Sequence, residues 1–463
     1  MSKFASVSDI DAALAGVITR QGNAVTVQNE AALQGEAMDR LVYNAVFADT
    51  AEVRGTCRWL IREIGNAVGC ASGSIHGLYM AMGRGEVPPM TVPAVNIRVL
   101  TYDTARAMVR AAQKVNSGAF IFEIAKSEIG YTFQRPSEYA AVILAACLRE
   151  GYRGPVFIQG DHFQVNAKKY NQDPEAAVHE VRELISEAIP AGFYNIDIDS
   201  STLVDLAFPT VPEQQRHNFE RAAELTELVR ELEPAGITVS VGGEIGEVGE
   251  KNSTVEEFEA FMEGYNATLP SGMAGISKIS VQTGTSHGGV PTADGSVAEV
   301  ALDFAVLKDI SKSAREKYHI SGTVQHGAST LPDEAFNQFV SNNASEVHLA
   351  TGFQNMIYDS RNIPEDLKQD VFNWLRENCA DEMKDGQTEA QFLYKTRKKG
   401  FGPFRERFWT LPQANRAGIG QELEDKFVFL YEQLGVRGSS VQVNQHVKVV
   451  KSGRSLADEI ACA

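Results

Sequence analysis

The sequence predicts an α/β fold: a (β/α)8 TIM barrel with a helical N-terminal extension and a mixed C-terminal extension. Short apolar, β-branched segments alternate with longer segments of helical spacing, and eight such short segments lie between residues 91 and 352. Eight strands alternating with helices over about 270 residues fit this barrel, which typically takes about 250 residues. A doubly wound open sheet is the alternative, but no G-x-G-x-x-G follows the first predicted strand.

The predicted elements follow one another in regular order. The first four strands are TVPAVNIRV (91–99), AFIFEIAKS (119–127), PVFIQGDH (155–162) and YNIDIDSS (194–201). The last four are TVSVGGEIG (238–246), ISKISVQTG (276–284), SGTVQHGAS (321–329) and EVHLATG (346–352). Helical spacing predicts helices between them at residues 104–117, 135–150, 174–189, 213–233, 254–263, 297–317 and 332–342.

The segments on either side of the barrel have a different character. Residues 1–90 are predicted to be mainly helical, because RLVYNAVF and TCRWLIREIG carry apolar residues three and four positions apart. Residues 365–463 form a mixed extension that contains the basic segment KTRKKGFGPFRERF (395–408). This segment is a solvated face in one interpretation, and an anion-binding or subunit contact in the other. We therefore expect a barrel domain at 91–364 between two extensions.

Composition argues against two classes of protein. The net charge of −17 disfavours a nucleic-acid-binding protein, which needs a basic surface. No run of about 18 apolar residues occurs, so we expect no membrane span, and MSKFASVSDIDAALAG does not resemble a secretory signal. Five scattered cysteines without a CxxC pair indicate reduced thiols. We therefore expect a cytoplasmic protein.

Polar side chains gather at the ends of the predicted strands, and in a parallel barrel the carboxyl ends of the strands build the active site. The residues found there are Asn96, Ser127, Asp161, His162, Asp199, Glu244, His287 and His326. A single histidine among glycines, such as His287, is more often a turn residue, but three on three different strands predict a metal site. Three imidazoles with an open fourth position are typical of catalytic zinc, which acts as a Lewis acid.

Six segments at these strand ends resemble the motifs of one family, in the same order along the chain. They are VPAVNI, FEIAKSEIG, QGDHFQ, GGEIGEVG, GTSHGG and QHGAST. Each is similar to a segment of the class II, metal-dependent fructose-bisphosphate aldolases and their tagatose-bisphosphate relatives. The resemblance covers the whole predicted barrel and implies a retro-aldol enzyme, a lyase.

The resemblance also implies a ligand set for a metal. His162, His287 and His326 would hold Zn²⁺ or another divalent transition metal, which polarises the ketose carbonyl. Glu244 matches a glutamate that lies near the metal and ligates it in an alternative position. His-rich sites bind zinc, cobalt or iron according to supply, so the identity of the metal stays open.

The remaining site residues follow from the same resemblance. Asp161 would exchange a proton with the C4 hydroxyl, and Glu250 would move the proton at the carbon, although Glu247 lies in the same loop. Residues expected to contact the sugar or to lie near the metal site are Asn96, Ser127 and Asp199. Residues expected to hold phosphate through glycine-rich loops are Gly288, Gly327, Ser329 and Thr351. The resemblance adds a monovalent cation at this phosphate site.

Three departures from the family pattern concern the substrate. The lysine that follows the strand-six His-Gly and supports phosphate is absent from HGGVPTADG. His348 stands where the family has a substrate-contacting Asn, and Thr330 replaces the last Gly of a His-Gly-Gly-Ser-Gly motif. A lost lysine removes a charge-assisted contact. Cleavage chemistry is therefore better supported than binding of a particular bisphosphate.

The sequence thus predicts cleavage of fructose 1,6-bisphosphate to dihydroxyacetone phosphate and glyceraldehyde 3-phosphate by a homo-oligomer. Cleavage of tagatose bisphosphate or another ketose phosphate is the first alternative. A non-catalytic barrel subunit is the second, although such a subunit is expected to lose the metal ligands. A metal-dependent hydrolase would normally show His-x-His on the first strand, and no histidine lies near Asn96.

Overall fold

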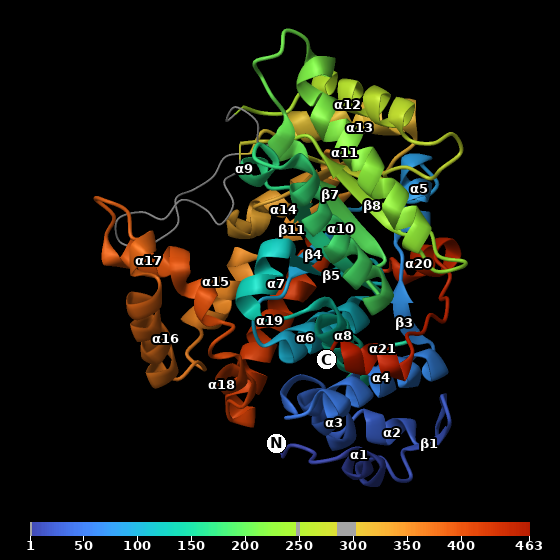
Figure 1. Cartoon of the computed structure of the whole chain (residues 1–463), viewed down its shortest axis with the longest axis vertical. Helices are drawn as coiled ribbons and strands as arrows, with labels where there is room; N and C mark the ends of the chain where they lie inside the picture. The colour runs from blue at the N-terminus through green and yellow to red at the C-terminus, as the bar shows by residue number, and fades with distance from the viewer. Residues whose placement is uncertain (1, 247–250, 285–301) are drawn as a thin grey trace.

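The computed structural model describes residues 2–246, 251–284 and 302–463 (Figure 1). Its centre is a closed, eight-stranded parallel barrel. The barrel strands are β4 (Val92–Asn96), β5 (Ile121–Ala125), β6 (Gly154–Gln164), β7 (Asn195–Asp199), β8 (Ser240–Glu244), β9 (Lys278–Val281), β10 (Thr323–Gln325) and β11 (Glu346–Leu349). Strands that follow one another along the chain pair in parallel, and β11 pairs with β4 to close the barrel. The predicted TIM barrel is confirmed, and each predicted strand overlaps one of these eight.

The barrel strands are covered on both sides. Every residue of β4, β5, β7 and β8 is buried, because the inner face meets the barrel interior and the outer face meets helices. Such strands appear in a sequence as continuous apolar runs rather than as a strict alternation. Polar residues within these runs therefore mark the inner face or the strand ends.

A ninth strand joins the barrel from the N-terminal region. β3 (Cys70–Gly73) pairs in parallel with the first residues of β6, whereas β7 pairs with β6 from Gln159 onward. β3 therefore lies beside the first part of β6, at the amino end of the barrel, and β7 lies beside the second part. Most other elements of this region are helices, namely α1 (Val7–Ala13), α2 (Glu30–Leu33), α3 (Glu36–Phe47), α4 (Ala51–Val68) and α5 (His76–Gly83). β3 and the hairpin of β1 (Ile18–Gln21) and β2 (Ala24–Val27) are not predicted from the sequence, because four-residue strands are too short to show periodicity.

In the described part of the chain, a major helix follows each of the first seven barrel strands, as predicted. These helices are α6 (Thr101–Val115), α8 (Pro136–Arg149), α10 (Pro174–Ala191), α11 (Val211–Leu232), α12 (Val255–Thr268), α13 (Phe304–Tyr318) and α14 (Phe336–Ser341). Two short helices, α7 (Lys126–Thr132) and α9 (Ala167–Tyr170), precede α8 and α10. Local signals fix several starts: proline occupies the first position of α8 and α10, and Thr254 and Glu257 form a capping box at α12.

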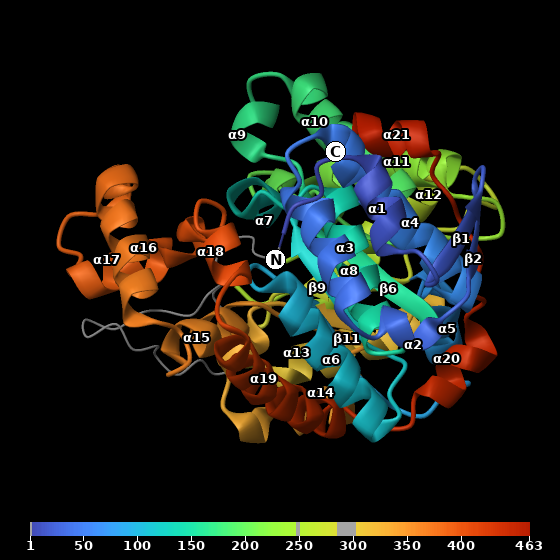
Figure 2. The ribbon, with the colours of Figure 1, turned by 90° about the horizontal axis from the view of Figure 1, so that it is seen from below.

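The eighth outer helix comes from much farther along the chain. α19 (Gln413–Gln433) packs against α6 and α14, as Figure 2 shows from below. Between β11 and α19 lie α15 (Thr351–Asp359), α16 (Glu365–Asn378), α17 (Glu389–Thr396), the 3-10 turn η5 (Arg397–Gly400) and α18 (Arg405–Trp409). We call residues 351–412 the insertion; its helices α16, α17 and α18 stand out on one side of the barrel in both views. The predicted domain boundary after residue 364 falls within the insertion and stays a prediction.

The two ends of the chain meet. α21 (Leu456–Ala461) packs against α4, and α20 (Ser440–His446) packs against α5. Gly55 makes the first contact possible, because a Cβ there would lie 2.5 Å from Cα of Ile460. Among the described residues, no helix is both long and apolar enough to cross a membrane.

Candidate active site at the carboxyl end of the barrel

A cavity of about 570 Å³ opens at the carboxyl ends of the barrel strands. Predicted site residues that line it are Asn96, Ser127, Asp161, His162, His326, Gly327, Ser329, His348 and Thr351. Asp199 and Glu244 are buried beside His162. His287, Gly288 and Glu250 lie outside the described residues, and their predicted roles stay predictions. The barrel thus brings together residues that are up to 255 positions apart in the sequence, from Asn96 to Thr351.

Asp161 and His162 both reach this cavity although neighbouring strand residues normally face opposite sides. A β-bulge accounts for this: the pairing of β6 with β7 shifts register between Gly160 and Phe163. His162 has a φ of 41°, in the left-handed region, where a non-glycine backbone is strained. Gly160 is needed here, because a Cβ would lie 2.4 Å from the ring of Phe163. The local irregularity therefore aims two adjacent functional groups at one cavity.

His162, Glu244 and His326 form a set that fits a metal ion. Their ligand atoms all lie within 4.8 Å of one another, and the rings of the two histidines are 4.3 Å apart. Two imidazoles and a carboxylate are donors that Zn²⁺ and similar transition metals bind. Burial lowers the pKa of His162, but Asp161, Glu244 and Asp199 together raise it well above its ordinary value. Carboxylates that stabilise a positive imidazole also favour a metal cation in its place.

Asp199, at the end of β7, orients His162. Its Oδ2 lies 3.0 Å from Nδ1 of His162 and accepts a hydrogen bond of 2.6 Å from Gln164. Its Oδ1 accepts from the backbone N–H and the hydroxyl of Ser201, at 3.1 and 2.8 Å. Oε2 of Glu244 lies 3.2 Å from the same Nδ1 of His162. Two carboxylates at Nδ1 place the proton there and leave Nε2 for a metal. The contact with substrate predicted for Asp199 stays a prediction.

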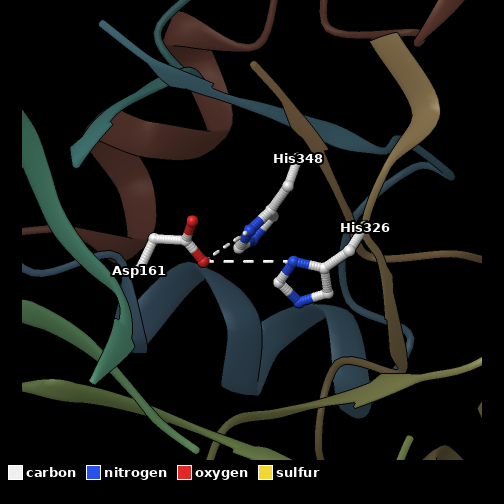
Figure 3. Close-up of side chains that lie close together, drawn as sticks. All are labelled: Asp161, His326 and His348. Carbon is white, nitrogen blue, oxygen red and sulfur yellow. Dashed lines mark hydrogen bonds and ion pairs between the residues drawn. The ribbon is translucent and has the colours of Figure 1, made fainter. Parts of the chain in front are cut away.

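The carboxylate of Asp161 faces two histidines, His348 and His326 (Figure 3). Its Oδ1 is 3.2 Å from Nδ1 of His348 and 3.9 Å from Nδ1 of His326. Asn96 donates a hydrogen bond of 2.8 Å to Oδ2. Burial raises the pKa of Asp161, but the charge of His162 and the hydrogen bond from His348 lower it well below its ordinary value. Asp161 is therefore an ionised carboxylate in a fixed position, which is what a proton acceptor requires.

Below the site, charged side chains occupy an interior that large aliphatic residues usually fill. Lys278 is buried, and its Nζ lies 2.9 Å from Asp197, 2.5 Å from Glu346 and 2.8 Å from Gln159. Gly242 makes room for this group, because a Cβ there would lie 2.3 Å from Oδ1 of Asp197. Although burial raises the pKa of Glu346, Lys278 and His348 lower it to about 2. A buried ionic network therefore supports the site from beneath.

The loops after β10 and β11 meet at the rim of the cavity. Gly327 has a φ of 70°, and the hydroxyl of Ser329 accepts a hydrogen bond of 3.0 Å from the backbone N–H of Gly352. A Cβ at Gly352 would lie 2.2 Å from the carbonyl oxygen of Ser329, so only glycine allows this approach. Thr351 accepts a hydrogen bond of 3.3 Å from Arg98. These loops carry the predicted phosphate contacts and stand at the mouth of the site.

Several residues that line the cavity are not predicted from the sequence: Arg98, Lys126, Glu128 and Tyr131. The carboxylate of Glu128 lies 2.6 Å from Nε of Arg98 and accepts a hydrogen bond of 2.9 Å from the side chain of Asn96. A signal existed for Lys126 and Glu128, which flank Ser127 in FEIAKSEIG. The sequence also contains a sign of the ionic network. Asp197, Lys278 and Glu346 each interrupt an apolar run, and each lies two residues before another polar residue near the end of the same strand. Residues two apart on a strand face the same side of the sheet. Lys398, which also lines the cavity, belongs to the basic segment 395–408, for which an anion-binding contact is one of the two interpretations of the sequence.

One family profile and several solved structures are similar to this chain. The profile of the family described as "Fructose-bisphosphate aldolase class-II" matches residues 86–398, well over half of the chain. No curated protein matches the chain by sequence. Among solved structures, fructuronate-tagaturonate epimerase UxaE from Cohnella laeviribosi is 12% identical with a TM-score of 0.55, covering 90% of this chain and 93% of its own.

Two further structures are similar. A probable tagatose 6 phosphate kinase from Sinorhizobium meliloti 1021 is 18% identical with a TM-score of 0.51, over 80% of this chain and 98% of its own. A fructose-bisphosphate aldolase from Campylobacter jejuni is 17% identical with a TM-score of 0.47, and the match covers 79% of this chain and 97% of the aldolase chain. At such identities, the similarity to the first two of these three structures shows the fold.

Proposed function

The chain belongs to the class-II fructose-bisphosphate aldolase family, and from this premise we propose that it is a metal-dependent lyase that cleaves a ketose bisphosphate. The proposed substrate is fructose 1,6-bisphosphate, and the products are dihydroxyacetone phosphate and glyceraldehyde 3-phosphate. The proposed metal is Zn²⁺. The observation that carries the proposal is the set of His162, Glu244 and His326, which lies beside the ionised Asp161 at the mouth of the barrel.

In this proposal, His162, His326 and Glu244 hold the metal together with the predicted ligand His287. A metal bound there supplies a Lewis acid for the carbonyl of the ketose. Asp161 takes the proton from the C4 hydroxyl as the bond between C3 and C4 breaks, so that C4 becomes the aldehyde carbon. The electron pair of the broken bond moves toward the C2 carbonyl, and C3 then accepts a proton, a step predicted for Glu250.

Lys398 supplies a cation for the substrate phosphate in place of the family lysine. It lines the cavity, and no hydrogen bond or ion pair joins its ammonium group to another described residue. Burial and the nearby charge of Arg98 lower the pKa of Lys398. A phosphate dianion beside Lys398 would oppose both effects, because it offers hydrogen bonds and a charge of opposite sign. The site therefore favours an anionic sugar over a neutral one.

The insertion fixes Lys398 at the cavity through the residues around it. η5 packs against α7, and Nζ of Lys398 lies 5.7 Å from the centre of the Tyr131 ring. A Cβ at Gly402 would lie 2.3 Å from the carbonyl oxygen of Tyr131, so the two backbones are in close contact. The side chain of the neighbouring Arg397 packs against Tyr358, with its guanidinium 5.0 Å from the centre of the ring. The hydroxyl of Tyr358 donates a hydrogen bond of 2.9 Å to the backbone carbonyl of Arg397. The insertion thus completes a site that the barrel strands leave open.

Tagatose bisphosphate or another ketose phosphate is the second candidate substrate. The observation that favours it is the altered pair of phosphate loops: no lysine follows the strand-six His-Gly in HGGVPTADG, and Thr330 replaces the last Gly of the strand-seven motif. Epimeric ketoses differ in the direction of a single hydroxyl, so a phosphate held in a different place changes which epimer fits the site. Values of kcat/KM for the two bisphosphates decide between these candidates.

A coupled cleavage assay tests the proposed function. We expect purified protein to cleave fructose 1,6-bisphosphate, to lose this activity after dialysis against a chelator, and to regain it with added Zn²⁺. His326→Ala should lower kcat/KM by at least about 10³-fold, because it removes a metal ligand. His179→Ala, at an exposed position of α10, is the matched control and should behave like the wild type. Full activity of the chelated protein or of His326→Ala would contradict the proposal.

A further inference from the structure

A row of alternating charges leads from the cavity into the barrel interior. It runs from Asp161 through His348 to Glu346 and then to Lys278, with separations of 3.2, 2.5 and 2.5 Å. Asp161 and His348 line the cavity, whereas Glu346 is fully buried beneath them. His348 and Glu346 lie two residues apart on β11, so both side chains face the barrel interior.

Both ring nitrogens of His348 face carboxylate groups. Nδ1 lies 3.2 Å from Oδ1 of Asp161, and Nε2 lies 2.5 Å from Oε1 of Glu346. The ring is 3% exposed and packs at 4.2 Å against the ring of His326. Carboxylates accept hydrogen bonds, so each nitrogen of His348 donates one. His348 therefore has no ring nitrogen left for the sugar.

Glu346 holds its position through further contacts. Lys278 and Gln159 donate to Oε1 at 2.5 and 2.8 Å, and the hydroxyl of Tyr79 donates to Oε2. A fully buried carboxylate with this many donors has one stable orientation, because any rotation would leave buried polar groups unpaired. The Glu346 carboxylate is consequently a rigid support for the imidazole of His348.

We propose that His348 is a positioning residue that acts through Asp161: Glu346 fixes the imidazole from below, and the imidazole fixes Oδ1 of the carboxylate that accepts the substrate proton. This inference rests on the proposed function. It replaces the predicted role of His348 as a substrate contact. The chemistry needs such a support, because Asn96 holds only the other oxygen, Oδ2, and a misplaced carboxylate slows proton transfer.

Two substitutions separate the two contacts of His348. His348→Asn keeps a donor near the place of Nδ1 and loses the contact with Glu346, whereas His348→Gln keeps a donor near the place of Nε2 and loses the contact with Asp161. We expect His348→Gln to lower kcat by about 10²-fold and His348→Asn by no more than about tenfold. KM and the metal content should stay within about twofold of the wild type in both.

Glu346→Gln provides a test away from the cavity. It should lower kcat about as much as His348→Gln, and the double variant should be no slower than the slower single variant, because both changes release the same carboxylate. Wild-type kcat in His348→Gln would overturn the proposal. A large rise of KM would show a substrate contact instead, and loss of metal would show a ligand, which the set of Asp161, His326 and His348 would permit.

A spectroscopic measurement keeps this inference separate from the proposed function. In protein labelled with ¹⁵N-histidine, the Nδ1–H signal of His348 should shift in Asp161→Asn whether or not any ketose is cleaved. If the wild type cleaves no ketose bisphosphate but this shift occurs, the proposed function fails and the contact stands. The opposite result is also informative. If the wild type cleaves the ketose bisphosphate, His348→Gln keeps the wild-type kcat and the Nδ1–H signal of His348 does not shift in Asp161→Asn, the proposed function stands and the positioning role fails.

Discussion

Replacing Lys398 by Gln tests how the insertion takes part in substrate binding. Lys398 is half-buried at the cavity and lies beside Tyr131, whose buried hydroxyl has no hydrogen-bond partner among the described residues. Arg98 is already paired with Glu128 at 2.6 Å, and Lys126 donates to the carbonyl of Gln164 at 2.9 Å. Of these three cavity cations, Lys398 is therefore the one whose charged group makes no hydrogen bond or ion pair with a described residue.

The size of the effect follows from this geometry. One charge-assisted hydrogen bond to a phosphate contributes about 1.5–3 kcal/mol, because the ammonium group is partly desolvated. At 25 °C this corresponds to a rise of about 10- to 150-fold in Kd or KM. The carboxamide of Gln is neutral and shorter, so it cannot replace the contact. We expect kcat to change by less than about threefold, because Lys398 does not touch the reacting carbons.

The neighbouring lysine provides a matched control. Lys399 pairs with Glu382 and does not line the cavity. Calorimetric titration with inorganic phosphate and steady-state cleavage of fructose 1,6-bisphosphate should both detect Lys398→Gln, whereas Lys399→Gln should match the wild type. Equal phosphate affinity in Lys398→Gln and the wild type would show that Lys398 does not bind the phosphate. If Lys399→Gln has the larger effect, the anion binds outside the cavity.

Three further predictions concern the barrel and the N-terminal region. Lys278→Met leaves buried carboxylates without their cation and should cost about 3–5 kcal/mol, or roughly 3–5 °C in Tm for a chain of this length; a Tm within about 1 °C of the wild type would contradict this. Gly242→Ala places a Cβ 2.3 Å from Asp197 and should destabilise by about 1–3 kcal/mol in urea unfolding. Burial and Arg230 lower the pKa of His76 from 6.5 to about 4, so its contribution to stability, roughly 3 kcal/mol, is present above pH 6.5 and lost as the pH falls to about 4. His76→Gln should remove this pH dependence of unfolding, and an unchanged dependence would argue against it.

Much of the barrel could be predicted from local pattern alone. Each barrel strand is a short apolar run between turn signals, and such runs are visible in any window of the sequence. The rule that active sites lie at the carboxyl ends of barrel strands then predicts His162, His287 and His326 as site residues. The ring centroids of His162 and His326 lie 4.3 Å apart, and their role as metal ligands stays a prediction.

Other features depend on contacts between distant segments. The bulge in β6 depends on the pairing partner β7, so no local pattern shows that Asp161 and His162 reach one cavity. The charges of Lys278 and Glu346 are visible within apolar runs, but their pairing depends on which strands face each other across the barrel. β3 and the hairpin near the N-terminus are too short to be recognised without their partners.

The strands, their order and the polar residues at their ends can be predicted without any contact, because they depend on residue periodicity and on a general rule for parallel barrels. The role of α19 as the eighth outer helix and the place of Lys398 at the cavity depend on how the folded chain packs. The same packing brings His348 against Asp161 and Glu346. The physical reason is that these arrangements are set by packing between segments far apart in the chain, where no local propensity specifies the partner.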